Sequence, residues 1–335
     1  MGPLVNADEL VAVTVMGQIA HPVGRAAAYR IGHDGVPRVL PGTGGIVINR
    51  RIGDLCVGLA GDHIEPGVAL HNNGREVIGP RDGPNNALIT YACVGNAARV
   101  ISGPCAGKCG FVTGKHGGVN HVLVDFPTEV LLRLRIGDRI QIVSHGLGLR
   151  LLQHPRIEVL NCSPRLLRRW GLTESDGTLH VPATHLVPAR IMGSGLGKNT
   201  AWRGDYDIQL ADRMTRERYR LGSLRFGDMV AITDADTRRG PSFRSGRTTI
   251  GVVVHGDSTV SGHGPGVTPL LTGPATLLRP RHDRNANLAE IFGVRRAAPP
   301  RQRRTLTERD PSRRCITGEP PPRLAFATGR GSGEQ

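Results

Sequence analysis

The sequence predicts an α+β, strand-rich protein built from two β-barrel-like or sandwich-like modules with short helices and glycine-rich loops. Two observations carry this prediction. Short β-branched runs bounded by Gly, Pro or Asp recur along the chain, and 46 of the 335 residues are glycine. Because an interior Gly costs a helix or strand about 0.5–1 kcal/mol, most of these glycines are expected in turns and loops.

The expected strands are the most apolar of these runs, and they lie at 11–15, 45–49, 122–126, 140–143 and 249–255. Two segments instead favour helices. Small residues at 86–100 allow a helix that packs closely on its neighbours, and 163–170 is a short helix with Pro164 in its first turn, where a missing N–H is harmless.

A short turn motif recurs three times, at 51–54, 135–138 and 225–228, each time as Arg, an apolar residue, Gly and Asp. Such a turn starts a strand, because the Gly takes a positive φ and the Asp side chain caps nearby N–H groups. The repeat indicates modules with similar corners. The alternative is a common turn that occurs three times by chance.

The expected division of the chain is an N-terminal strand-rich module at 1–128, a C-terminal strand-rich module at 129–290 and a tail at 291–335. The tail is rich in arginine and proline and has too little apolar surface to offset its ordering entropy, so it is expected to be disordered. We expect it to lie outside the fold.

Composition excludes several classes of function. No run of 18 apolar residues could span a membrane, and the N-terminus lacks the pattern of a secretory signal. Six scattered cysteines fit reduced thiols in a cytoplasm better than a disulfide framework. We therefore expect a cytoplasmic protein.

Nucleic acid is an unlikely partner despite the net charge of +15. Thirteen arginines against six acidic residues between 279 and 335 account for +7 of that charge, so the rest is spread thinly over the body. Aromatic residues, on which single strands stack, make up only 4% of the chain. A small-molecule substrate is expected instead, and a homo-oligomer is compatible with the sequence.

Three loops rich in His, Asp and Gly are the candidates for a functional site. In the first, at 61–67, His63 and Glu65 share one face of an extended segment while Asp62 points the other way. His63 is a candidate metal ligand and Glu65 a candidate general base.

In the second loop, at 114–125, His116 lies on a glycine loop before a strand and is a candidate acid or base. Lys115 beside it is a candidate for binding a substrate carboxylate or phosphate, as is Arg225 from the third turn motif.

The third loop, at 254–266, is the most informative. His255 and Asp257 share a face at the end of an apolar strand, where we expect them at the rim of a pocket, and the chain then returns His263 between glycines. His255 and Asp257 are candidates both for catalysis and, with His63 and His263, for metal binding. The alternative for each loop is a structural hydrogen bond between His and Asp.

A mixed set of imidazoles and carboxylates suits a divalent transition metal such as Zn, Mn or Fe. An ion with an open position lowers the pKa of bound water and polarises a carbonyl group. No nucleotide cofactor is expected, because the loop at 193–199 has one residue too few for a phosphate loop and no Ser or Thr after its Lys. Backbone amides of this loop and of 262–266 are candidates for oxyanion stabilisation, with Ser194, Gly195 and Gly264 contacting substrate.

Several spaced motifs resemble one family, the bacterial domain of unknown function 4438; they lie at 40–46, 61–67, 114–118, 192–197 and 262–267. The likeness runs from about residue 8 to residue 290, and the cysteines at 105–109 depart from it. The resemblance implies a two-module architecture and no activity. A looser likeness links the Gly-Asp turns and His-rich loops to acetamidases and formamidases, which are metal-linked amide hydrolases.

These observations favour a metal-dependent, hydrolase-like enzyme that acts on a small amide, lactam or ester. Two alternatives stay open. The first is a metal-free lyase, isomerase or cyclase on a small anionic metabolite, with His255 or His116 as acid or base and Lys115 and Arg225 binding the carboxylate. The second is a protein that binds a small ligand without catalysis. If the histidines of the three loops serve one site, at least two of the loops are expected to line a single pocket.

Overall fold

The structure is a computed structural model that describes residues 4–24, 27–74 and 83–294. The chain divides into two compact units, residues 1–296 and residues 297–335, and the fold below is that of the first unit. The tail expected at 291–335 lies outside the described residues from 295 onward. In the described part of the chain, no helix is long and apolar enough to cross a membrane.

The first half of the fold is a closed β-barrel. Its strands pair in the order β1 (Val13–Ile19), β9 (Arg139–Ser144), β6 (Ala97–Val100), β7 (Cys109–His116), β8 (His121–Asp125), β5 (Gly67–His71) and β4 (Ile46–Val47). Because β1 also pairs with β5, six of these strands close on themselves. β9 belongs to this barrel, so the sheet runs across residue 128, where the sequence analysis placed the end of the first module.

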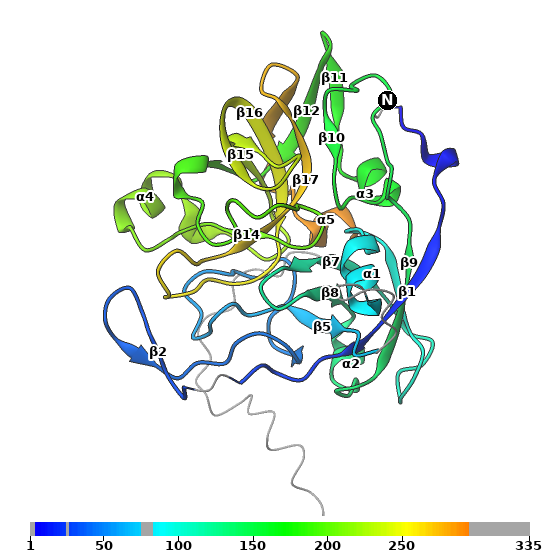
Figure 1. Cartoon of the computed structure of the whole chain (residues 1–335), viewed down its shortest axis with the longest axis vertical. Helices are drawn as coiled ribbons and strands as arrows, with labels where there is room; N and C mark the ends of the chain where they lie inside the picture. The colour runs from blue at the N-terminus through cyan, green and yellow to red at the C-terminus, as the bar shows by residue number, and fades with distance from the viewer. Residues whose placement is uncertain (1–3, 25–26, 75–82, 295–335) are drawn as a thin grey trace, which may run out of the picture. The chain divides into compact units, whose positions relative to one another are not determined.

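The second half is a six-stranded sheet, drawn above the barrel in Figure 1. It contains β10 (Glu158–Val159), β17 (Gly266–Pro274), β16 (Ser242–Val253), β15 (Met229–Asp236) and β13 (His185–Pro188), with β14 (Tyr206–Asp207) paired to β17. Two smaller sheets flank these, made of β11 (Thr173–Ser175), β12 (Thr178–Ala183) and β18 (Leu278–His282), and of β2 (Arg30–Ile31) and β3 (Pro37–Arg38).

The helices are short, as expected: α1 (Pro84–Tyr91), α2 (Thr128–Leu131), α3 (Pro164–Arg169), α4 (Arg213–Arg218) and α5 (Leu288–Ile291), with three 3-10 turns, η1 (Ala7–Glu9), η2 (Ala189–Ile191) and η3 (Leu221–Ser223). The predicted strand-rich fold class is confirmed. The helix at 163–170 is also confirmed, and Ser163 caps it by accepting from the Leu166 N–H.

The helix expected at 86–100 is wrong in its second half. The backbone leaves helical geometry at Ala92, and Gly95 follows with φ +88° before β6 begins at Ala97. The small residues of this segment do pack closely, as the sequence suggested, but they do so in a turn and a strand. The spacing of small residues does not distinguish a helix from a turn followed by a strand, because small side chains fit both structures.

The three repeated turns share one geometry, which confirms that they are equivalent corners. In each turn the Asp carboxylate accepts from the N–H of the Arg three residues earlier at 2.9 Å. Gly53, Gly137 and Gly227 all have φ between +82° and +89°, a region that favours glycine. The second and third turns lead into β9 and β15, as expected.

The barrel and the second sheet share a hydrophobic core. Leu123 of the barrel packs in one cluster with Val252 and Leu270 of the second sheet. A further contact joins β7 to β17, where the Thr268 hydroxyl accepts from the Lys115 N–H and donates to the Lys115 carbonyl. This junction places the end of β7 beside the start of β17 and so determines where the functional loops meet.

Removing the tail is expected to leave the fold intact. A chain that ends at Arg296 contains the whole first unit, so we expect its melting temperature to lie within about 2 °C of that of the full chain. Thermal unfolding followed by circular dichroism tests this. A larger drop would show that residues 297–335 stabilise the first unit.

Candidate metal centre

His255 is the most buried of the site histidines and follows the end of β16. Its Nδ1 lies 2.9 Å from the Gly256 carbonyl oxygen, which can only accept, so Nδ1 carries a proton. The other ring nitrogen, Nε2, faces two carboxylates. It lies 2.8 Å from Oδ2 of Asp205 and 3.5 Å from Oδ1 of Asp207.

The contact between His255 Nε2 and Asp205 Oδ2 is close but lacks hydrogen-bond geometry, and each atom is buried without a hydrogen-bond partner. In native proteins such buried polar atoms are rare and require an explanation. Two electron-pair donors that face the same point at this distance are what a bound cation requires. The pair therefore fits a metal ion that accepts from both atoms.

His63 approaches from the loop before β5 and is held in a left-handed conformation with φ +57°. Its Nδ1 lies 2.8 Å from Oδ1 of Asp62, and Asp62 is itself bound by Arg30 and by the Ser258 hydroxyl. This leaves Nε2 of His63 directed at the site, where it lies 3.0 Å from Nδ1 of His263.

His116, at the end of β7, is oriented by a buried carboxylate. Glu65 contacts its Nδ1 at 2.7 Å and also contacts Nδ1 of His121 and the Gly44 N–H. A carboxylate that holds the far nitrogen of a ligating His is the usual outer shell of a metal centre. Glu65 therefore orients His116 and does not face the cavity as a free general base. The expected alternation that placed Glu65 beside His63 fails because His63 is not in extended backbone.

Asp205 and Asp207 are the functional residues that the sequence analysis missed. They flank Tyr206 at β14, so alternation along the strand places both carboxylates on the same face. Asp205 is fixed by the Gly117 N–H, which donates to its Oδ1 at 2.8 Å. The sequence signal for these two carboxylates is the Asp-Tyr-Asp pattern itself, which lies outside the three loops that contain the histidines.

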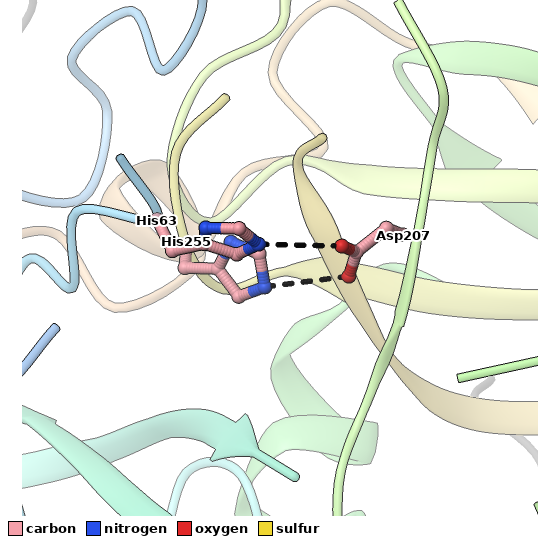
Figure 2. A group of neighbouring side chains, drawn as sticks. All are labelled: His63, Asp207 and His255. Carbon is pink, nitrogen blue, oxygen red and sulfur yellow. Dashed lines mark ion pairs between the residues drawn. The ribbon is translucent and has the colours of Figure 1, made fainter. Parts of the chain in front are cut away.

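The donor atoms form two groups in which all atoms lie within 4.8 Å of one another: His63, Asp207 and His255, and His116, Asp205 and His255. Figure 2 shows the first group, with His63 and His255 both directed at the Asp207 carboxylate. Donors bound at about 2.0–2.2 Å around one ion are separated by about 3–3.5 Å. The separations of 2.8–3.5 Å seen here fit that requirement.

The electrostatics of the centre favour positive charge. Burial opposes charge on His255, but Asp205 and Asp207 raise its pKa well above the usual value. Burial likewise opposes charge on His63, whose pKa is raised by its contacts with Asp207 and Asp62. The same contacts hold the pKa of Asp207 well below its usual range, against the effect of burial. The carboxylates of the site therefore favour the binding of a cation.

Metal affinity is expected to rise with pH. Because the pKa values of His63 and His255 lie above the usual 6.5 in the metal-free protein, each still holds a displaceable proton near neutral pH. Below those pKa values, affinity should fall about tenfold per pH unit for each proton displaced. Calorimetric titration with Zn²⁺ in buffers of different ionisation enthalpy measures the released protons. An affinity that is flat between about pH 6 and 8 would contradict this.

Asp205 and Asp207 line a cavity of about 260 Å³, to which all three of the loops singled out in the sequence contribute through His63, His116 and His263. Their convergence, predicted from the sequence, is confirmed by ring centroids 4.9 Å apart for His63 and His255 and 4.3 Å apart for His116 and His255. Ser194 and Gly195, expected to contact substrate, also line this cavity.

Three further candidates do not reach the cavity. Lys115 is fully buried, and its Nζ donates to Asn161 and to the carbonyl oxygens of Thr90 and Trp202. Burial lowers the pKa of Lys115 to about 7. Its three acceptors give it a structural role.

Arg225 lies in a different pocket, where it contacts Asp228 and the Arg284 carbonyl. Asp257 belongs to neither donor group. Its carboxylate accepts from the Ser258 N–H, and its carbonyl oxygen accepts from the His63 N–H. Asp257 thus supports the backbone at His63, and burial raises its own pKa.

Sequence models of the family described as Domain of unknown function (DUF4438) match most of the chain, the N-terminal model at 29–168 and the C-terminal model at 169–292. The chain belongs to the DUF4438 family. The two family regions meet well beyond residue 128, and the residues of the candidate site come from both of them.

The chain is also similar to a solved protein described as "Crystal structure of TM1086". The two share 41% sequence identity and a TM-score of 0.81, over 88% of this chain and 99% of that one. No curated protein matches the chain.

Proposed function

We propose that this DUF4438 protein is a metal-dependent hydrolase that acts on a small amide, lactam or ester. One observation carries the proposal. His63, His116 and His255 each have Nδ1 bound to a fixed acceptor, and each directs Nε2 toward the same buried pair of carboxylates. Histidines with one nitrogen anchored on an acceptor and the other directed at a group of ligand atoms are organised for ligation.

A divalent ion bound there would supply a water of lowered pKa and polarise a carbonyl oxygen. The residues of the chain divide the remaining tasks. Asp62, Glu65 and the Gly256 carbonyl keep the three imidazoles in position. His263, whose side chain is 31% exposed at the cavity wall, directs Nδ1 at Asp207 and His63 and is placed to complete the ligand set on the solvent side.

Backbone amides are poorly placed to stabilise an oxyanion. The Ser194 N–H donates to the Gly262 carbonyl at 2.6 Å, and the Gly264 N–H is directed at Oδ2 of Asp207. Arg30 and Lys198 instead bring two cationic side chains to the cavity wall. They suit a substrate that carries a carboxylate beside the bond to be broken.

The geometry does not favour the metal-free lyase, isomerase or cyclase. That hypothesis assigned carboxylate binding to Lys115 and Arg225, and neither residue lines the cavity. A small-ligand-binding protein without catalysis would use the same cavity. It is distinguished from a hydrolase by turnover.

The test combines metal analysis with a hydrolysis screen. Purified protein is analysed for transition metals and assayed on small amides, lactams and esters, before and after a chelator and after addition of Zn²⁺, Mn²⁺ or Fe²⁺. We expect bound metal, loss of hydrolysis on chelation and recovery on metal addition. Absence of metal binding, with folding unaffected by chelation, would refute the proposal. Metal binding without turnover would leave a binding protein.

A further inference from the structure

We propose that the centre binds two divalent ions, bridged by the carboxylate of Asp207. This inference rests on the proposed function in that it uses the same residues, but it concerns the number and arrangement of the ions. It assigns His63 and His263 to one ion and His116, His255 and Asp205 to the other.

The two oxygens of Asp207 face different partners. Oδ2 lies 3.1 Å from Nδ1 of His263 and 3.5 Å from Nε2 of His63. Oδ1 lies 3.5 Å from Nε2 of His255. Figure 2 shows this division directly, with one dashed contact leaving each oxygen. A carboxylate that offers one oxygen to each of two ligand sets is in the position of a bridge.

The first set forms a compact triangle. Nε2 of His63 and Nδ1 of His263 are 3.0 Å apart, and each is within 3.5 Å of Oδ2 of Asp207. These edges match the spacing of three donors around one ion with bond lengths near 2.0–2.2 Å, which is about 3–3.5 Å. Since His263 is partly exposed, this ion would lie on the solvent side of the centre.

The second set lies deeper. Nε2 of His255 is 2.8 Å from Oδ2 of Asp205 and 3.5 Å from Oδ1 of Asp207, and His116 completes a group with His255 and Asp205. Neither of the closest two atoms has a hydrogen-bond partner. This set therefore fits an ion of its own, separate from the one at His263.

A single ion fits the six side chains poorly. If all six bound one octahedral ion, no position would remain for water or substrate, although a catalytic ion needs an open one. If a single ion bound only at His63 and His263, Nε2 of His255 and Oδ2 of Asp205 would stay buried without a hydrogen-bond partner.

Two ions held about 3.5–4 Å apart can stabilise both the attacking and the leaving oxygen of a substrate. The site would then accept a substrate whose carbonyl group or carboxylate spans both ions. Arg30 and Lys198 at the cavity wall suit the anionic end of such a molecule.

The experiment loads metal-free protein with Mn²⁺ and measures metal per chain together with the electron paramagnetic resonance spectrum. We expect two ions per chain and an exchange-coupled spectrum. His263→Ala should retain one ion and show an uncoupled six-line spectrum, and Asp207→Asn should lose the coupling. His282→Ala, on an exposed strand outside the site, is the matched control and should keep two coupled ions. Circular dichroism confirms that each variant is folded.

One ion per chain at saturating Mn²⁺ would overturn the two-ion proposal and leave the metal-dependent hydrolase standing. If two ions bind without exchange coupling and His263→Ala does not change the number bound, Asp207 does not bridge them, and this proposal is refuted. No bound ion would refute both proposals together.

Discussion

His255→Ala is expected to abolish both metal binding and hydrolysis. Nε2 of His255 faces both Asp205 and Asp207, so its loss removes a ligand of the deeper ion and a contact of the carboxylate proposed to bridge the two ions. Loss of a residue that merely orients a ligand costs about 10–100-fold in metal affinity, and loss of the ligand itself should cost more than 100-fold. Metal content after dialysis and turnover of the wild-type substrate measure the two effects.

The same substitution should also destabilise the metal-free protein. His255 was expected at the rim of a pocket, where its removal would cost little, but it is fully buried between Asp205 and Asp207. Removing one partner of a buried charged group costs about 3–5 kcal/mol. Urea unfolding with a chelator present measures this. His282→Ala, with an exposed side chain, is the control. Retained metal and activity in a folded His255→Ala protein would contradict the assignment of the centre.

Local patterns predicted the fold class and several details because their causes are local. The three Gly-Asp turns and the capped helix at 163–170 depend on residues within three positions of one another. Closure of the barrel depends on β1 pairing with both β9 and β5, contacts between distant segments that no short motif encodes. The module boundary at residue 128 was predicted without knowledge of these strand pairings.

The sequence predicted the histidines of the site but not the carboxylates that they face, for the same reason. Glycine-flanked histidines drew attention to His63, His116, His255 and His263, and these do converge. Their carboxylate partners could not be paired from the sequence. Asp62, Glu65 and Asp257 are close to the histidines in sequence, but they hold the far ring nitrogens or the backbone. Asp205 and Asp207, which face the site, come from a strand far away in sequence.

Gly266 offers a second test with a large effect, because it adds atoms to the centre without removing a ligand. Gly266 is the first residue of β17 and lies next to Asp205 and His255. A Cβ at this position would lie 2.0 Å from Oδ2 of Asp205 and 2.2 Å from Nε2 of His255, both far inside van der Waals contact. Gly266→Ala must therefore displace the two atoms that face each other across the deeper ion position.

We expect Gly266→Ala to lower metal affinity by more than about 100-fold, with a similar loss of hydrolysis and a stability cost of about 1–3 kcal/mol from overpacking. Metal titration followed by chemical denaturation separates the two effects. Gly222→Ala is the matched control, since a Cβ there meets no atom within 4 Å. If the histidines and aspartates formed only a structural network, Gly266→Ala would cost stability alone, and chelation would change the stability of neither the wild type nor the variant. A selective loss of metal in a folded variant instead identifies the facing atoms as ligands, because the substitution leaves every donor side chain in place.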